Sequence, residues 1–184
     1  MEIPRRPAVL LDRDGVINQD SANFVRTPDA LIPLPGSLAA IRRLKEAGWL
    51  VAVCTNQSGV GRGLYSLRDL QAVHGRLRQL LGEHNTSVDG IYACPHHPDD
   101  GCDCRKPKPG LLLQAARELP IDLATSFMVG DAGRDLEAGI RAGCSPVLVL
   151  TGKGRQTRDE AVAAGIPSYD CLADFVDSLL QGRP

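Results

Sequence analysis

The sequence predicts an α/β protein, a three-layer, Rossmann-like arrangement of one parallel sheet with helices on both faces. Short apolar runs alternate with amphipathic stretches along all 184 residues, which is typical of consecutive strand–helix units. Such alternation favours a parallel sheet that is covered on both sides. The length suits one domain, residues 1–184, and no internal repeat, low-complexity tract or linker interrupts it.

Five apolar runs are predicted strands: 8–11, 50–54, 88–93, 127–129 and 146–150. Helices are expected between them from the positions of capping and stop residues. One begins near Ser37 and stops at Gly48, and another begins near Ser66, where Asp69 completes a capping box. A third helix is expected to open at Pro109, and a fourth is expected to end just before Gly143. Two more are expected at 158–164 and 172–180.

Composition excludes several classes of function. The 21 Lys and Arg residues nearly balance 22 Asp and Glu residues, and no long basic stretch occurs, so no nucleic-acid partner is expected. No apolar run approaches the roughly 18 residues of a membrane span, and the first residues are too short and polar for a signal peptide. We expect a soluble, cytoplasmic protein without a membrane partner, and a monomer by default.

The first predicted strand runs into Asp12-Arg13-Asp14-Gly15. Two carboxylates two residues apart project the same way from an extended chain and repel each other, so they favour a hard cation such as Mg²⁺. A calcium loop is the alternative. It requires Gly at its sixth position and Glu at its twelfth, whereas Gly15 is fourth and Asn23 stands at the twelfth position.

Other strands also end in polar residues: Thr55 follows the second, Lys106 lies beyond the third, and Asp131 ends the fourth. The carboxyl ends of parallel strands meet at one edge, so these residues can converge with Asp12 and Asp14. A metal-binding acidic cluster, a hydroxyl and a cation are the groups that phosphoryl transfer requires. Each motif taken alone has an ordinary structural interpretation. The Asp12–Asp14 pair could be part of a turn and Thr55 a strand end. Lys106 could be a solvated charge and Asp131 a helix cap.

This set, in this order, resembles the haloacid dehalogenase superfamily of phosphatases over nearly the whole chain. The resemblance implies that Asp12 is the nucleophile and that Asp14 is the general acid and base. Thr55 and Lys106 would hold the phosphoryl group, while Asp12, the Asp14 carbonyl and Asp131 would bind Mg²⁺. Asp135 would support the metal or cap its helix. The intervals between motifs leave no room for the cap domain that most members carry.

A second metal site is predicted at 94–104, where Cys94, His96, Cys102 and Cys104 offer three sulfurs and one imidazole. This is a structural zinc set with no open position. His97 is the competing ligand, and three unpaired thiols are the alternative without metal. Because Lys106 follows directly, zinc is expected to brace the loop that aims it.

The motifs around Asp12, Thr55 and Cys94 are similar to the superfamily branch that hydrolyses heptose bisphosphates. The resemblance implies removal of a C7 phosphate, for the nucleotide-activated heptose of lipopolysaccharide core. Histidinol-phosphate phosphatases share the zinc loop and remain the alternative, and a non-catalytic zinc module is a third. Ala132 stands where some members carry Lys, and Lys153 is expected to be an exposed loop lysine. The predicted substrate-binding residues are Asp20, Ser21, Ala22, Asn23, Asn56, Gln57, Ser58 and Arg105.

Overall fold

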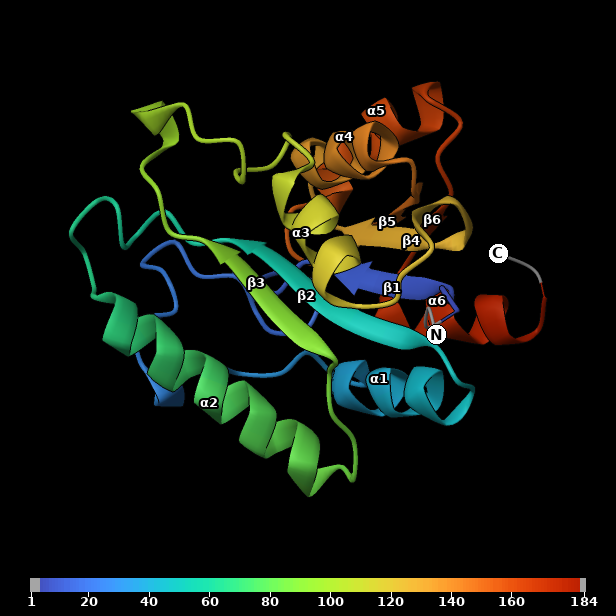
Figure 1. Ribbon diagram of the computed structural model, residues 1–184, viewed down its shortest axis with the longest axis horizontal. Coiled ribbons are helices and arrows are strands. Elements are labelled where there is room, and N and C mark those ends of the chain that lie inside the picture. Colours follow the sequence, from blue (N-terminus) through green and yellow to red (C-terminus); the bar gives the residue numbers. More distant parts are fainter. Residues whose placement is uncertain (1–3, 183–184) are drawn as a thin grey trace.

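The computed structural model describes residues 4–182. Within them, one sheet of six parallel strands runs through the molecule in the order β3-β2-β1-β4-β5-β6 (Figure 1). The strands are β1 (Ala8–Leu11), β2 (Leu50–Asn56), β3 (Gly90–Cys94), β4 (Phe127–Gly130), β5 (Ser145–Val149) and β6 (Ser168–Tyr169). The predicted fold class, a parallel sheet without a cap domain, is confirmed.

Helices form the outer two layers. One face of the sheet carries α1 (Ser37–Glu46), α2 (Leu67–Glu83) and α6 (Leu172–Leu180). The other carries α3 (Gly110–Glu118), α4 (Gly133–Ala142) and α5 (Gly154–Ala163) (Figure 1). Short 3-10 helices lie at Pro28–Ala30, Pro98–Asp100 and Leu123–Thr125.

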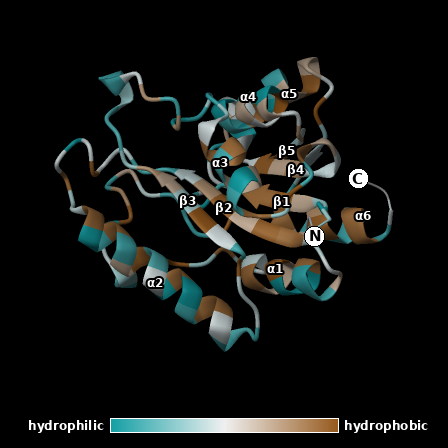
Figure 2. Ribbon diagram, viewed as in Figure 1, coloured by the Kyte–Doolittle hydropathy of each residue, from teal (hydrophilic) through white to brown (hydrophobic). Residues whose placement is uncertain are grey.

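The side chains of β1 alternate between the two faces of the sheet, so the strand packs against both helix layers. Val9 and Leu11 pack with the α1, α2 and α6 side, whereas Ala8 and Leu10 pack with the α3 and α4 side. All four side chains are fully buried, and Figure 2 shows the strands as the hydrophobic layer of the molecule. Truncating such a core leucine to alanine costs about 2–5 kcal/mol.

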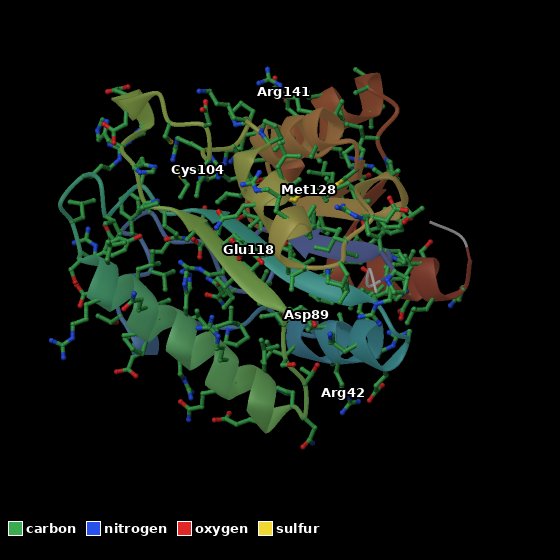
Figure 3. The ribbon with its side chains drawn as sticks, in the orientation of Figure 1. Arg42, Asp89, Cys104, Glu118, Met128 and Arg141 are labelled. Carbon is green, nitrogen blue, oxygen red and sulfur yellow. The ribbon has the colours of Figure 1, made fainter. Side chains whose placement is uncertain are left out.

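Polar and charged side chains occupy the outer surfaces. Arg42 of α1 and Arg141 of α4 are exposed on opposite layers, and Met128 of β4 is buried between them (Figure 3). Within residues 4–182, no helix combines the length and the apolar character that crossing a membrane would need.

Most element boundaries match the sequence predictions. The capping box of α2 is present: Asp69 N donates to Ser66 Oγ at 3.1 Å and Ser66 N to Asp69 Oδ2 at 2.8 Å. Three predictions are wrong in detail. β3 begins at Gly90 rather than 88, α5 begins at Gly154 rather than 158, and the sixth strand, β6, was not predicted. A strand of two residues is too short to show a periodic pattern.

The parallel sheet brings distant segments to one edge. Asp12, Asn56, Cys94 and Asp131 all lie at or just after the carboxyl end of a strand. Between Asp12 and Asn56 the chain forms α1 and a single 3-10 turn, and between Asn56 and Lys106 it forms α2 and β3. Neither interval contains an inserted domain within the described part of the chain, so the edge stays open to small molecules.

Candidate active site

Lys106 is buried between two carboxylates at this edge. Its Nζ lies 3.0 Å from Asp12 Oδ1 and 2.6 Å from Asp135 Oδ1, and only 1% of the lysine is exposed. Burial alone would lower the pKa of Lys106, but the two carboxylates outweigh it and raise that pKa above its usual value. The lysine is therefore charged at neutral pH and places a positive charge directly beside the Asp12 carboxyl group.

Asp131 offers a free oxygen to this cluster. Its Oδ2 accepts from Lys153 N at 2.8 Å, whereas its buried Oδ1 has no hydrogen-bond partner. Burial raises the pKa of Asp131 to about 7, and the negative charge of Asp12 adds to the effect. Gly15, at φ 84°, is required here because a Cβ would lie 2.1 Å from Asp131 Oδ2.

The carboxylates fit a divalent cation. One oxygen each of Asp12, Asp131 and Asp135 lie within 4.8 Å of one another. Three carboxylates with one buried orphaned oxygen suit the hard, oxygen-ligated Mg²⁺. Of the predicted magnesium ligands, Asp12 and Asp131 are thus brought together. Asp135 also caps α4, as expected, by accepting from Ala132 N at 3.1 Å, and its contact with Lys106 was not predicted.

Asp14 points into the cavity from the turn after β1 and accepts four hydrogen bonds. Arg13 donates from Nε to Oδ1 at 3.0 Å and from Nη2 to Oδ2 at 3.1 Å. Asn18 Nδ2 donates to Oδ1 and Gln57 Nε2 to Oδ2, both at 2.8 Å. The carboxylate is therefore oriented from three sides.

The last two residues of β2 lie beside Lys106 and the cavity. Thr55 is 1% exposed at the end of the strand. The Asn56 side chain donates to Lys106 O and accepts from Lys106 N, both at 3.0 Å. Asn56 was predicted to bind substrate, and in the structure both polar atoms of its amide bond the backbone of Lys106.

A cavity of about 460 Å³ opens over these groups. Asp12 and Asp14 lie in its wall, while Thr55, Lys106 and Asp131 are buried behind it. Seven of the eight predicted substrate-binding residues line it, namely Asp20, Ser21, Ala22, Asn56, Gln57, Ser58 and Arg105. Asn23 does not, because it is exposed and its carbonyl accepts from Arg26 Nε at 2.7 Å.

Three further lining residues were not predicted: Phe24, Arg134 and Lys153. Lys153 is an exposed loop lysine, as expected, but it also lines the cavity. It follows β5 at the same sheet edge, and its Nζ lies 3.3 Å from Asp20 Oδ2. Arg134 lies in the first turn of α4, and its buried Nε has no partner. Nearby carboxylates, Asp135 first, raise its pKa although burial opposes them. The strand-edge rule applied to 151–154 could have identified Lys153.

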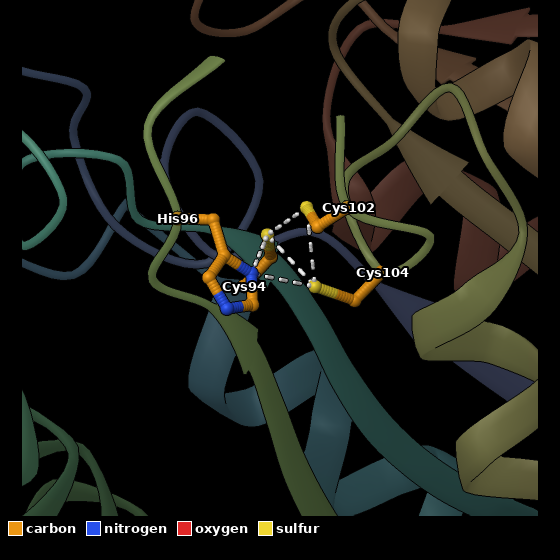
Figure 4. A group of neighbouring side chains, drawn as sticks. All are labelled: Cys94, His96, Cys102 and Cys104. Carbon is orange, nitrogen blue, oxygen red and sulfur yellow. Dashed lines mark hydrogen bonds between the residues drawn. The ribbon is translucent and has the colours of Figure 1, made fainter. Parts of the chain in front are cut away.

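The Cys/His loop, residues 94–104, gathers its four predicted ligands. Their Sγ and Nδ1 atoms point toward one another (Figure 4), and contacts among them measure 3.0–3.6 Å. Tetrahedral zinc with bonds to sulfur of about 2.3 Å requires ligand separations of roughly 3.8 Å, so the set fits with small adjustments. His97 lies outside it and accepts from Asp99 N at 3.2 Å.

This loop is tied to the catalytic groups by the backbone. Gln57 N donates to Cys94 O at 2.8 Å, and Gly61 N donates to Pro95 O at 2.7 Å. Cys104 is separated from Lys106 by one residue. These links connect the Cys/His loop to Lys106 and to the 55–61 segment.

Comparison with known proteins agrees with the site. Residues 103–178 match the model of the HAD-hydrolase-like family. A parallel sheet with a buried Asp–Lys–Asp cluster at its carboxyl edge, beside a second Asp two residues after the first, defines a phosphatase of the haloacid dehalogenase class.

Full-length relatives define the family more narrowly. The chain is 51% identical over 176 residues to D-glycero-beta-D-manno-heptose-1,7-bisphosphate 7-phosphatase of Pseudomonas aeruginosa, covering 96% of this chain and 99% of that one. For the enzyme of that name from Bordetella bronchiseptica the identity is 49% over 174 residues, with coverage of 94% and 97%. The chain belongs to the family of D-glycero-beta-D-manno-heptose-1,7-bisphosphate 7-phosphatases.

Solved structures of two members of this family superpose on the chain. The crystal structure of the B. bronchiseptica D,D-heptose 1,7-bisphosphate phosphatase, complexed with magnesium and phosphate, superposes with a TM-score of 0.91 at 48% identity, covering 96% of this chain and 99% of that one. That of the Burkholderia thailandensis enzyme gives a TM-score of 0.71 at 38% identity, with coverage of 95% and 99%.

Proposed function

We propose that this phosphatase removes the C7 phosphate of D-glycero-β-D-manno-heptose 1,7-bisphosphate through an aspartyl-phosphate on Asp12, in the supply of nucleotide-heptose for lipopolysaccharide core. The observation that carries the proposal is the buried contact of Lys106 with Asp12, at 3.0 Å, beneath a cavity whose lining includes Arg105, Arg134 and Lys153. A phosphate dianion is repelled by an ionised aspartate, and the adjacent ammonium offsets that repulsion.

In the first step, an oxygen of Asp12 attacks the phosphorus and the bond from phosphorus to the sugar oxygen breaks. Asp14 faces the same cavity and protonates the departing oxygen. In the second step, Asp14 takes a proton from water as the water attacks the phosphorus, which releases phosphate and restores Asp12. Thr55 and Lys106 hold the phosphoryl oxygens throughout.

Mg²⁺ is the proposed cofactor. Asp12 and Asp131 would hold it together with the Asp14 carbonyl, and Asp131 Oδ1 is the buried oxygen without another partner. The cation, when bound, neutralises charge on the transferring phosphoryl group.

The second phosphate of the substrate has its own candidate partners. Arg105 and Arg134 line the cavity and each has a buried guanidinium nitrogen without a hydrogen-bond partner. A planar guanidinium binds phosphate oxygens in pairs. We infer that these two arginines hold the retained C1 phosphate. Some family members carry a lysine at the position of Ala132, and Arg134 would supply the positive charge of that lysine.

Zinc in the Cys/His loop is the second proposed metal, with a structural role. All four ligands come from the protein, so no position is left for substrate. We infer that the ion rigidifies the segment that carries Arg105 and Lys106.

The experiment that tests the proposed function is phosphate release from three substrates by the Mg²⁺-loaded enzyme. We expect the 1,7-bisphosphate to be hydrolysed at C7 with higher kcat/KM than histidinol phosphate, and the β anomer better than the α anomer. Asp12→Asn should abolish turnover of all three. Equal or higher efficiency with histidinol phosphate would overturn the assignment of substrate. The single domain, the monomeric state and the cytoplasmic location stay predictions.

A further inference from the structure

We infer that Tyr65 is a positioning residue that acts through the Gln57 amide on both Asp14 and Thr55. The inference deepens the proposed function and rests on it, because it assigns an outer residue to the acid–base and phosphoryl-binding groups of the same reaction.

The contacts form a branched chain of hydrogen bonds. The Tyr65 hydroxyl donates to Gln57 Oε1 at 2.8 Å. Gln57 Nε2 in turn donates to Asp14 Oδ2 at 2.8 Å and to Thr55 Oγ1 at 2.9 Å. The oxygen of the amide is therefore used by the tyrosine, and the nitrogen is used by the two residues at the reacting centre.

Tyr65 is held in a fixed place behind the cavity. It is 8% exposed, and its ring packs on the ring of Phe24 at a centroid distance of 6.3 Å. A Cβ on Gly59 would lie 2.1 Å from the Tyr65 ring, so the glycine makes the space that the ring fills. Burial is the main cause that raises the pKa of Tyr65 above its usual value, so the hydroxyl keeps its proton at neutral pH.

The orientation of the Gln57 amide has a chemical consequence at Thr55. A hydroxyl oxygen that accepts a hydrogen bond still has its own proton to donate. Because Gln57 Nε2 donates to Thr55 Oγ1, the threonine proton is left for a phosphoryl oxygen. A flipped amide would present its oxygen to Thr55 and draw that proton away from the substrate.

The same orientation serves Asp14. Asp14 must carry a proton in the first step and accept one in the second, so its carboxyl group has to keep a fixed place facing the leaving oxygen. Donors from Arg13, Asn18 and Gln57 hold it there. A flipped amide would set its oxygen against Asp14 Oδ2 and repel the charged form that the second step requires. Tyr65, by donating to the amide oxygen, stabilises the orientation that Asp14 and Thr55 require.

A double-mutant cycle on the Mg²⁺-loaded enzyme tests the inference. With the 1,7-bisphosphate, we expect Tyr65→Phe to lower kcat roughly five- to tenfold, the usual effect of one lost hydrogen bond, with little change in KM. Gln57→Leu should lower kcat on the order of 100-fold. In the Gln57→Leu background, Tyr65→Phe should have no further effect, because residues acting through one another are not additive.

The leaving group gives a second readout that a structural defect would not produce. An aryl phosphate with an acidic phenol needs little protonation of its leaving group, so Tyr65→Phe should impair its hydrolysis less than that of the sugar phosphate. Tyr92→Phe, which removes the hydroxyl of a buried tyrosine of β3 beside Glu118 and outside the site, is the matched control and should leave both rates unchanged.

Additive effects in the cycle, or equal losses on both substrates together with a lower melting temperature, would overturn the inference while leaving the phosphatase assignment intact. A wild-type enzyme without activity on the bisphosphate would instead contradict the proposed function.

Discussion

Asp135 Oδ1 lies 2.6 Å from Lys106 Nζ, closer than the 3.0 Å that separates the same nitrogen from Asp12 Oδ1, the proposed nucleophile. The lysine therefore has two counter-charges in a fully buried position. Asp135 satisfies the ammonium from the side of α4, so Lys106 can shift toward a phosphate without becoming an isolated buried charge.

Replacing Asp135 by Asn should lower both stability and activity. The NH2 group of the Asn side chain must face either Lys106 Nζ or Ala132 N, both of which are donors. Either the ion pair or the hydrogen bond that Asp135 now makes therefore becomes a repulsive contact. We expect the free energy of unfolding to fall by about 3 kcal/mol, as for other broken buried ion pairs, and kcat to fall at least about tenfold. Denaturant unfolding and phosphate release measure the two effects. Glu137→Gln, on the same helix but at the surface, is the control, and a wild-type-like Asp135→Asn would refute the argument.

Magnesium binding should depend on pH through Asp131. In the metal-free protein its pKa is raised from near 4 to about 7. At pH values between these two pKa values, the Asp131 carboxyl group keeps a proton in the folded protein that it has lost in the unfolded chain. Asp131 therefore makes the protein less stable as the pH rises from about 4 to 7. Mg²⁺ needs the deprotonated carboxylate. The rise in melting temperature on adding Mg²⁺ should be small near pH 5.5, larger near pH 8, and absent in Asp131→Asn. An equal rise at both pH values would contradict the role of Asp131.

Arg134→Gln should weaken binding of the bisphosphate. A lost charge-assisted hydrogen bond to phosphate is worth about 1.5–3 kcal/mol, so KM should rise at least about tenfold while kcat changes less. Heptose 7-phosphate, which lacks the second phosphate, should show no such rise. Arg141→Gln changes an exposed arginine of the same helix and serves as the control. If KM for the two sugars rises equally, Arg134 does not bind the retained phosphate.

The sequence predicted those site residues that directly follow an apolar run. Asp12, Thr55 and Asp131 each end a buried strand, and the parallel-sheet rule then brings them to one edge. Local patterns also located the helix ends, because a capping residue such as Ser66 lies next to the turn that it stabilises.

Contacts between segments distant in the chain could not be predicted from the sequence. Lys106 and Asp135 come from a loop and a helix whose packing no local pattern encodes. Asn56 was expected to contact substrate, but the path of the Cys/His loop brings the Lys106 backbone within reach of its amide. For Tyr65, the sequence shows only an aromatic residue before a helix cap, and its role depends on the rotamer of Gln57.

Removing the metal ligands of the Cys/His loop should lower activity without touching a catalytic group. The loop is bonded to Gln57 through Cys94 O and is one residue away from Lys106. Without zinc, Cys102→Ser should release this segment, so we expect at least about a tenfold loss in kcat/KM, the usual range for disturbed metal surroundings, and a melting temperature several degrees lower. Metal analysis should find one zinc per wild-type chain and none in the variant. Cys171→Ser, outside the loop and partly buried before α6, should keep zinc, activity and melting temperature. Normal turnover by a zinc-free Cys102→Ser protein would show that the loop does not position Lys106.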